Sequence, residues 1–155
     1  RLQSRAMQVV SVAGYKDSGK TSLVEALLAA MDSETRVATV KSLHHDVEFD
    51  TPDTDTYRHR TAGADTVVGL TPSMTAEFRS EGKDDGVDVE DQLALLEGRG
   101  FDWVIVEGFK DAALPTIAVG DIETSALGGP VLFRVDDGTA VDGASVLARL
   151  ESALE

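Results

Sequence analysis

Cysteine is absent from the 155-residue chain. Disulfide bonds, thiolate zinc sites and cysteine nucleophiles are therefore excluded, and a reducing compartment fits, so we expect a cytoplasmic protein. Long apolar runs are also missing, because none approaches the roughly 20 residues that span a bilayer. The start of the chain, RLQSRAMQVV, lacks the apolar core of a signal peptide. We expect no membrane partner.

Basic residues are scarce, with 14 Lys and Arg against 28 Asp and Glu and a formal net charge of -14. A nucleic-acid binder needs a basic footprint, so that class of partner is excluded. An acidic surface is typical of proteins adapted to high salt, and most of the acids then reflect habitat. The hydrophobic content of 42% predicts one globular domain over residues 1–155. Met7 is interpreted as the natural start, with residues 1–6 non-native or disordered.

Apolar runs rich in β-branched residues alternate with amphipathic segments of helical period. This alternation predicts an α/β fold in three layers, with a mostly parallel sheet and helices on both faces. The region 66–80 resembles a hairpin and is expected to add antiparallel strands at one edge. Strands are predicted at 8–13, 36–41, 65–70, 73–80, 101–108, 115–120 and 130–135, and helices at 20–31, 55–62, 89–97 and 142–154.

The segment GYKDSGKT, residues 14–21, matches the phosphate-binding pattern G-x-x-x-x-G-K-[ST] in full. It lies between a predicted strand and a predicted helix, which is the context the pattern requires. Backbone N–H groups of such a loop form an anion-binding nest, and the helix N-terminus adds its dipole. Lys20 is expected to reach the β- and γ-phosphates, and the Thr21 hydroxyl to bind Mg²⁺. The predicted nucleotide-binding residues are Gly14, Asp17, Ser18, Gly19, Lys20, Thr21 and Ser22.

The apolar run WVIVEG, residues 103–108, ends in a carboxylate. The second half of a phosphate site is an apolar strand that ends in an acid near the metal. Glu107 is therefore predicted to hold Mg²⁺ through water or to orient the attacking water. The alternative is an ordinary solvated carboxylate at the rim of the sheet.

The segment VKSLHHD, residues 40–46, offers several groups that suit phosphate chemistry. Lys41 supplies charge, His44 and His45 supply donors, and Asp46 supplies a catalytic or Mg²⁺-binding carboxylate. A zinc site of two histidines and one aspartate stays open, as does a solvated loop.

The segment DTDTYRHRTAGAD, residues 53–65, holds some of the few positive charges of the chain. Arg58 and Arg60 are interpreted either as facing an anionic ligand or as members of a solvated helix. In the second case Asp55 and Arg58 form a surface ion pair at helical spacing.

Together GYKDSGKTSL, VKSLHHD, DTYRHRTAGAD and WVIVEGFK resemble, in this order, the molybdopterin-guanine dinucleotide biosynthesis protein B family. The resemblance covers roughly residues 8–110 and implies a P-loop NTPase fold that binds GTP with Mg²⁺. It also implies a homodimer with weak GTP hydrolysis that assists a separate molybdenum cofactor guanylyltransferase in attaching GMP to molybdopterin. The matched residues are Gly14, Gly19, Lys20, Thr21, Ser22, Lys41, His44, His45, Asp46, Asp55, Tyr57, Arg58, Ala62, Gly63, Glu107, Gly108 and Lys110.

The chain departs from many GTPases in having no N-K-x-D segment to read guanine. A base-reading carboxylate is expected instead at Asp136 or Asp137, just after a late predicted strand. Two alternatives stay open. A small-molecule P-loop kinase would phosphorylate an added acceptor, and a non-enzymatic scaffold would use nucleotide only to order its dimer.

Overall fold

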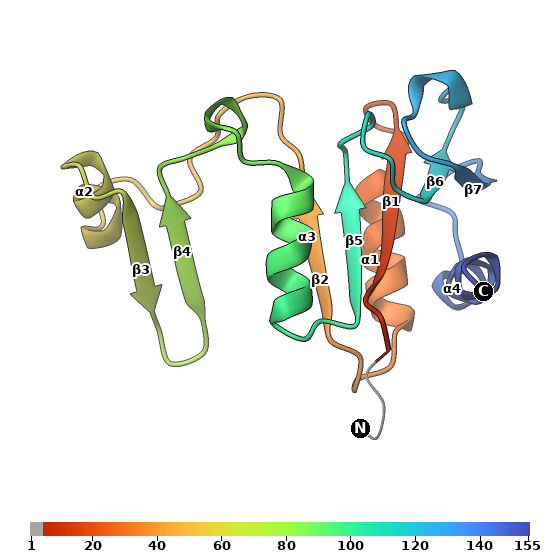
Figure 1. Ribbon diagram of the computed structural model, residues 1–155, viewed down its shortest axis with the longest axis horizontal. Helices are drawn as coiled ribbons and strands as arrows, with labels where there is room; N and C mark the ends of the chain where they lie inside the picture. The colour runs from red at the N-terminus through yellow and green to blue at the C-terminus, as the bar shows by residue number, and fades with distance from the viewer. Residues whose placement is uncertain (1–4) are drawn as a thin grey trace. The chain divides into compact units, whose positions relative to one another are not determined.

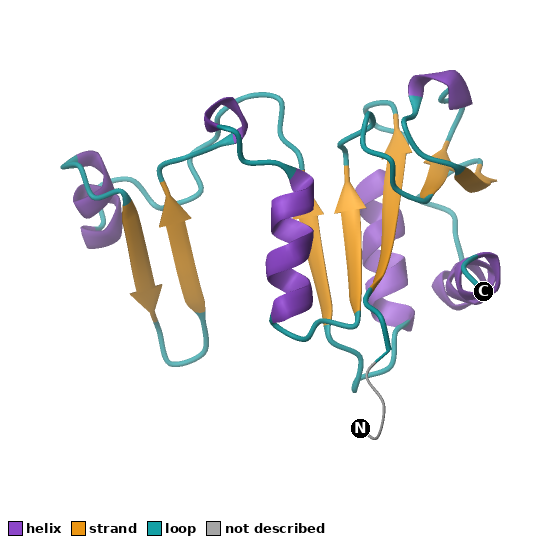
Figure 2. Cartoon of the chain, viewed as in Figure 1, coloured by secondary structure: helices purple, strands orange, loops and turns teal. Residues whose placement is uncertain are grey.

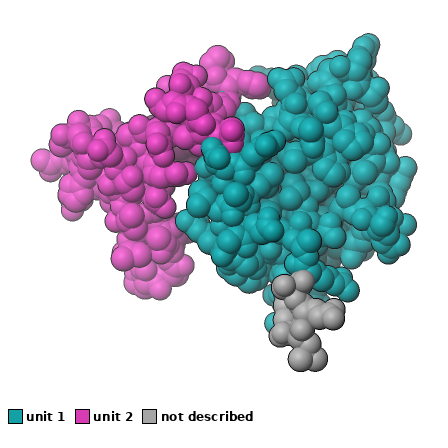
Figure 3. Space-filling view, viewed as in Figure 1, with its two compact units in different colours: residues 1–43, 89–155 teal, residues 44–88 magenta. Residues whose placement is uncertain are grey.

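The computed structural model describes residues 5–155, which divide into two compact units. Unit 1 comprises the described residues up to Leu43 together with Val89–Glu155, and unit 2 comprises His44–Asp88 (Figure 3). That residues 1–155 form one domain stays a prediction. Of the segment expected to be non-native or disordered, residues 1–4 lie outside the described residues.

Unit 1 is built on a five-stranded parallel sheet in the order β2-β5-β1-β6-β7 (Figures 1 and 2). The strand that precedes the phosphate loop, β1, therefore lies in the centre. The predicted mostly parallel sheet is confirmed. The strands are β1 (Gln8–Gly14), β2 (Val37–Lys41), β5 (Trp103–Glu107), β6 (Thr116–Val119) and β7 (Val131–Val135).

Helices cover both faces of this sheet, which makes three layers. On one face α1 (Lys20–Ala30) and α4 (Gly143–Ala153) pack beside each other, and on the other face α3 (Val89–Gly98) packs near β2. Short 3₁₀ helices follow at Thr124–Ala126 in unit 1 and Lys83–Asp85 in unit 2. Among the described residues, no helix combines the length and apolarity needed to cross a bilayer.

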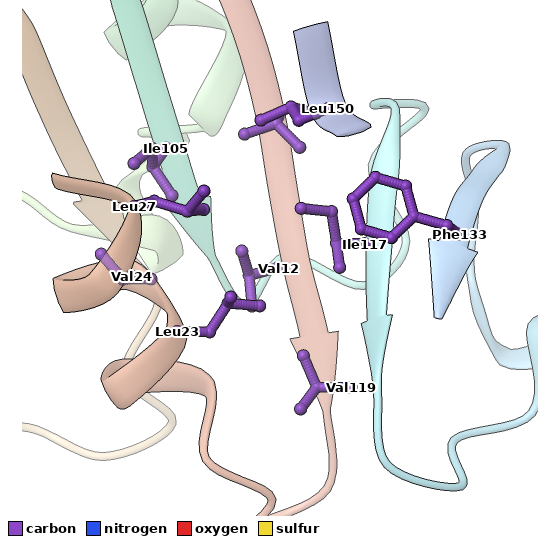
Figure 4. Close-up of a cluster of buried hydrophobic side chains, with 10 residues drawn as sticks. Val12, Leu23, Val24, Leu27, Ile105, Ile117, Val119, Phe133 and Leu150 are labelled. Atoms are coloured by element: carbon purple, nitrogen blue, oxygen red, sulfur yellow. The ribbon is translucent and has the colours of Figure 1, made fainter. Parts of the chain in front are cut away.

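Alternation along β1 separates the two apolar layers, because successive strand residues point to opposite faces. Val10 and Val12 are fully buried with Leu23 and Leu27 of α1. Figure 4 shows Val12, Leu23 and Leu27 in this cluster. Val9 points the other way and packs with the layer under α3. Leu23 and Leu27 are four residues apart, so both lie on the face of α1 that contacts the sheet.

Unit 2 contains the helix α2 (Asp55–Thr61) and an antiparallel pair of strands, β3 (Thr66–Leu70) and β4 (Thr75–Arg79). The predicted hairpin is present, and its strands form a sheet of their own and not an edge of the larger one. The helix packs against β3, where Val67 is buried.

Candidate functional site

The predicted phosphate loop lies between β1, which ends at Gly14, and α1, which begins at Lys20. Its first glycine is required by space. A Cβ atom at Gly14 would lie 2.5 Å from Ser18 Oγ and 2.7 Å from the Val119 carbonyl oxygen. Its second glycine is required by conformation, because Gly19 has φ 92° in the left-handed region. The two glycines of the motif therefore let the chain turn tightly between β1 and α1.

Unsatisfied donors collect at the start of α1. Among the described residues, no acceptor receives a hydrogen bond from the backbone N–H groups of Gly19, Lys20, Thr21 or Ser22. The helix has no side-chain N-cap and no acidic residue in its first turn. Ser18 Oγ is also buried without a hydrogen-bond partner in the described chain. Donors left in this way at a helix N-terminus are suited to bind an anion such as phosphate.

The Lys20 ammonium folds back across the loop and donates to the Gly14 carbonyl oxygen at 2.9 Å. This bond holds the side chain against the phosphate loop itself. An arriving phosphate offers a charged acceptor in place of a neutral carbonyl, and charge-assisted hydrogen bonds are the stronger kind. Lys20 is thus placed to exchange the loop carbonyl for phosphate.

Glu107 ends β5 and joins the phosphate loop to β2. Its Oε1 accepts a hydrogen bond from the Thr21 hydroxyl at 3.0 Å and an ion-paired hydrogen bond from Lys41 Nζ at 2.9 Å. The parallel register of β2 and β5 pairs Lys41 with Glu107, which brings these two predicted residues together. The Glu107 side chain is only 11% exposed, so the solvated-rim alternative is wrong for it.

The Thr21 hydroxyl and the Glu107 carboxylate are oxygen ligands of the kind that a magnesium ion binds. Mg²⁺ prefers carboxylate, hydroxyl and phosphate oxygens, and Thr21 with Glu107 would hold it beside the phosphates. When bound, the metal would neutralise charge on the phosphate oxygens. Nowhere in residues 5–155 do three or more His, Asp or Glu side chains gather as a metal-binding group, so the zinc alternative has no ligand set there.

The turn that follows β5 is tightly constrained. Gly108 has φ 94° and Phe109 has φ 53°, two successive residues in the left-handed region. The Ser42 N–H donates to the Glu107 carbonyl oxygen at 2.9 Å, and a Cβ at Gly108 would lie 2.9 Å from Ser42 Cβ. This turn fixes Glu107 relative to the end of β2. Lys110 follows it as an exposed side chain, and its phosphate contact stays a prediction.

Sequence reasoning missed the contact between the phosphate loop and the loop after β7. Gly138 N–H donates to the Ser18 carbonyl oxygen at 3.3 Å, and a Cβ at Gly138 would collide with the Gly19 carbonyl oxygen. The two residues are far apart in sequence, and the only local signal is the glycine in VDDGT. This contact brings the segment with the two candidate base-reading carboxylates against the phosphate loop.

The two aspartates of that segment differ in what surrounds them. Asp137 accepts hydrogen bonds from the Thr139 hydroxyl at 2.7 Å and the Thr139 backbone N–H at 2.9 Å. These bonds hold the pKa of Asp137 below its ordinary value of 3.8. The Asp136 side chain is exposed, and no described residue donates a hydrogen bond to it. Asp136 is therefore the carboxylate with free acceptor capacity.

The remaining predicted contacts belong to unit 2. His44, His45, Asp46 and Arg58 are exposed there, and their approach to the phosphate loop stays a prediction. Arg60 instead binds Glu48, with Arg60 Nη2 donating to Glu48 Oε2 at 2.5 Å. This bond lowers the pKa of Glu48 and raises the pKa of Arg60. Both line a hollow of about 710 Å³ within unit 2.

Comparison with known proteins agrees with this geometry. Residues 9–132 match the family model described as "Molybdopterin guanine dinucleotide synthesis protein B". A protein of Methanocaldococcus jannaschii named putative molybdopterin-guanine dinucleotide biosynthesis adapter protein is 44% identical over 106 residues, covering 68% of this chain and 42% of that protein. The molybdopterin-guanine dinucleotide biosynthesis adapter protein of Escherichia coli is 26% identical over 112 residues. That match covers 72% of this chain and 64% of the Escherichia coli protein.

A solved structure titled "molybdopterin-guanine biosynthesis protein B (mobB)" has a TM-score of 0.71 at 25% identity, covering 95% of this chain and 99% of that one. The matched part of the chain spans between two-fifths and two-thirds of the length of the two adapter proteins from Methanocaldococcus jannaschii and Escherichia coli.

Proposed function

Because the chain belongs to the molybdopterin guanine dinucleotide synthesis protein B family, we propose that it binds GTP with Mg²⁺ at the loop 14–21. In this role it acts as an accessory protein that assists a molybdenum cofactor guanylyltransferase in attaching GMP to molybdopterin. The names of the relatives, which call them adapter proteins, support this role.

One observation carries the proposal. The free N–H groups at the start of α1, the Lys20 ammonium and the Thr21–Glu107 pair converge at the carboxyl ends of β1 and β5. Ligands of open α/β sheets bind at this edge. Donors for phosphate and oxygen ligands for Mg²⁺ are therefore supplied within unit 1 alone.

Hydrolysis at this site is proposed to be weak. Fast phosphoryl transfer needs an arginine that neutralises the transition state and a residue that orients water. Among the described residues Glu107 is the one buried carboxylate, and it is engaged by a hydroxyl and an ammonium. Among the residues whose contacts are described, no arginine side chain bonds to the phosphate loop. The roles expected of His44, His45 and Asp46 stay predictions, and the proposal does not depend on them.

Guanine is the base proposed, on the ground that Asp136 has free acceptor capacity in the loop held against Gly19. A carboxylate accepts hydrogen bonds from the N1–H and N2–H₂ groups of guanine, whereas adenine presents an acceptor at N1. The same loop would therefore favour GTP over ATP.

A homodimer is proposed on the exposure of apolar side chains in unit 2. Val68, Leu70 and Met74 are 55%, 77% and 67% exposed on the β3–β4 hairpin. A second copy of the chain would cover such side chains and pair the open strand edges.

The test is calorimetry with the Lys20→Ala variant. We expect the affinity for GTP·Mg²⁺ to fall by roughly 100-fold or more, because the variant lacks the ammonium that would form charge-assisted hydrogen bonds to two phosphates. Thermal unfolding should change little, since the side chain donates a single hydrogen bond to Gly14. Lys16→Ala is the matched control, since Lys16 is an exposed lysine of the same loop.

The outcome also separates the alternatives. Unchanged GTP affinity in Lys20→Ala would refute the site. Equal binding of GTP and ATP by the wild type would refute guanine selection. Transfer of the γ-phosphate to an added small molecule would favour the kinase, and a lack of turnover with the guanylyltransferase present would favour the scaffold.

A further inference from the structure

A single oxygen atom in the site serves two donors. Glu107 Oε1 accepts from the Thr21 hydroxyl at 3.0 Å and from the Lys41 ammonium at 2.9 Å. The hydroxyl is the group proposed to bind Mg²⁺. The ammonium therefore already places one positive charge beside the carboxylate that the metal would use.

We propose that Lys41 excludes free Mg²⁺ from the nucleotide-free protein by pairing with Glu107, so that the metal enters only together with a nucleotide. This inference rests on the proposed function, because it concerns the metal that accompanies GTP. It assigns Lys41 a role in the order of binding, beyond a contact to phosphate. Lys41 is a positioning residue in this scheme, since it acts through Glu107.

The physical basis is competition between two cations for one carboxylate. The Glu107 side chain is 11% exposed, so its charge is poorly solvated and favours a close counter-ion. A divalent ion bound at Thr21 would lie close to the Lys41 ammonium and be repelled by it. Nucleotide phosphates remove this conflict, because they bring enough negative charge for both the metal and the ammonium.

The mobility that such an exchange needs is present in the side chain and not in the backbone. Lys41 is the last residue of β2, an edge strand of the sheet, and its side chain is 51% exposed. The next residue is fixed, because Ser42 N–H donates to the Glu107 carbonyl oxygen. The four-carbon stem can therefore swing the ammonium from Glu107 to a phosphate while the strand end stays in place.

The negative net charge of the chain increases the need for a group that keeps free Mg²⁺ away from Glu107. A formal net charge of -14 raises the concentration of divalent cations around the protein. Without a competing cation, a buried carboxylate next to a hydroxyl would attract Mg²⁺ in the absence of nucleotide.

The experiment measures binding of Mn²⁺ alone to the nucleotide-free protein by electron paramagnetic resonance of the free ion. We expect Lys41→Met to bind one Mn²⁺ at least roughly tenfold more tightly than the wild type, because the competing charge is gone and the stem is kept. Lys41→Arg, which retains the charge, should exclude Mn²⁺ as the wild type does.

Two controls separate the proposed pairing from a general charge effect. Lys16→Met removes the same charge from an exposed lysine of the phosphate loop and should leave Mn²⁺ affinity nearly unchanged. In a Glu107→Gln background the gain from Lys41→Met should vanish, since the two residues act on the same oxygen. Thermal unfolding of each variant establishes that it is folded.

Equal Mn²⁺ affinity in wild type and Lys41→Met would overturn the inference. So would an equal gain in Lys16→Met, or a gain that survives Glu107→Gln. Because these measurements use no nucleotide, they stand apart from the Lys20→Ala test. A protein that fails to bind GTP can still show the Mn²⁺ effect, and one that binds GTP can lack it.

Discussion

At the scale of single residues, the site depends on which polar atoms are already engaged. Glu107 accepts two hydrogen bonds and Asp137 accepts two, whereas Ser18 Oγ and the first N–H groups of α1 have no partner among the described residues. Buried polar groups are normally paired. The concentration of unpaired groups in one loop therefore marks the place where a ligand is expected to supply their hydrogen-bond partners.

Asp137 gives a residue-scale prediction of pH dependence. Its pKa is lowered below 3.8, chiefly by the Thr139 hydroxyl, so its bonds stabilise the fold above that ordinary value. This contribution is lost as the pH falls through the lower pKa of the folded protein. Thr139→Val should raise the pKa of Asp137 toward 3.8 and weaken the acid dependence of stability.

Carbon-detected NMR titration of the Asp137 carboxyl group measures this pKa directly. Thr61→Val is the matched control, because the Thr61 hydroxyl donates only to the backbone carbonyl oxygens of Tyr57 and Arg58. An Asp137 titration that does not move in Thr139→Val would show that the backbone N–H alone sets the pKa.

At the scale of elements, two loops from opposite ends of the chain hold each other. The phosphate loop follows β1, the other loop follows β7, and Gly138 packs directly on Gly19. The contact leaves no room for a methyl group. The phosphate loop is thus contacted by a residue that belongs to no nucleotide-binding pattern.

Gly138→Ala tests this contact. We expect it to lower the free energy of unfolding by about 1–3 kcal/mol, as overpacking does, and to weaken GTP binding by displacing the phosphate loop. Denaturant titration and calorimetry measure the two effects.

Gly98→Ala is the control, since a Cβ there meets nothing within 4 Å and the residue ends α3. Wild-type stability and GTP affinity in Gly138→Ala would show that the loops can separate without cost.

Local sequence patterns predict the elements of this fold, whereas the contacts between distant segments escape them. Every predicted strand and helix is present, and the ends differ by at most two residues, as at β5, expected from 101 and observed from Trp103. These elements and the phosphate loop are encoded in local patterns of apolar residues and glycines. The Lys41–Glu107 ion pair and the Gly138 contact depend on strand order and register, which local patterns do not contain.

At the scale of the whole molecule, the hairpin of unit 2 is only half covered. The helix α2 packs against β3 beside the buried Val67, while Val68 and Leu70 are exposed. Successive strand residues face opposite ways, so Val68 and Leu70 share the open face. The same face carries the ion pair of Glu77 and Arg79, so apolar and charged side chains lie on it together. Among the described residues the outer edges of β3 and β4 are unpaired, and such edges indicate a surface that another chain can join.

Leu70→Glu is expected to shift the proposed homodimer toward monomer, because a charge placed in an apolar interface remains unpaired and desolvated. Analytical ultracentrifugation over a range of concentrations measures the shift. Leu95→Glu is the control, since Leu95 is 45% exposed on α3 in unit 1. A wild type that sediments as monomer at all concentrations would contradict the homodimer.

The central place of β1 in the sheet has a consequence for synthesis on the ribosome. Its partners are distant in sequence, because Val10 pairs with Ile105 and Ser11 pairs with Thr116. An emerging chain therefore carries the glycine turn and its lysine without both neighbouring strands of β1 to support them until roughly a hundred further residues have been made. Nascent polypeptides should bind nucleotide only after β6 has left the exit tunnel.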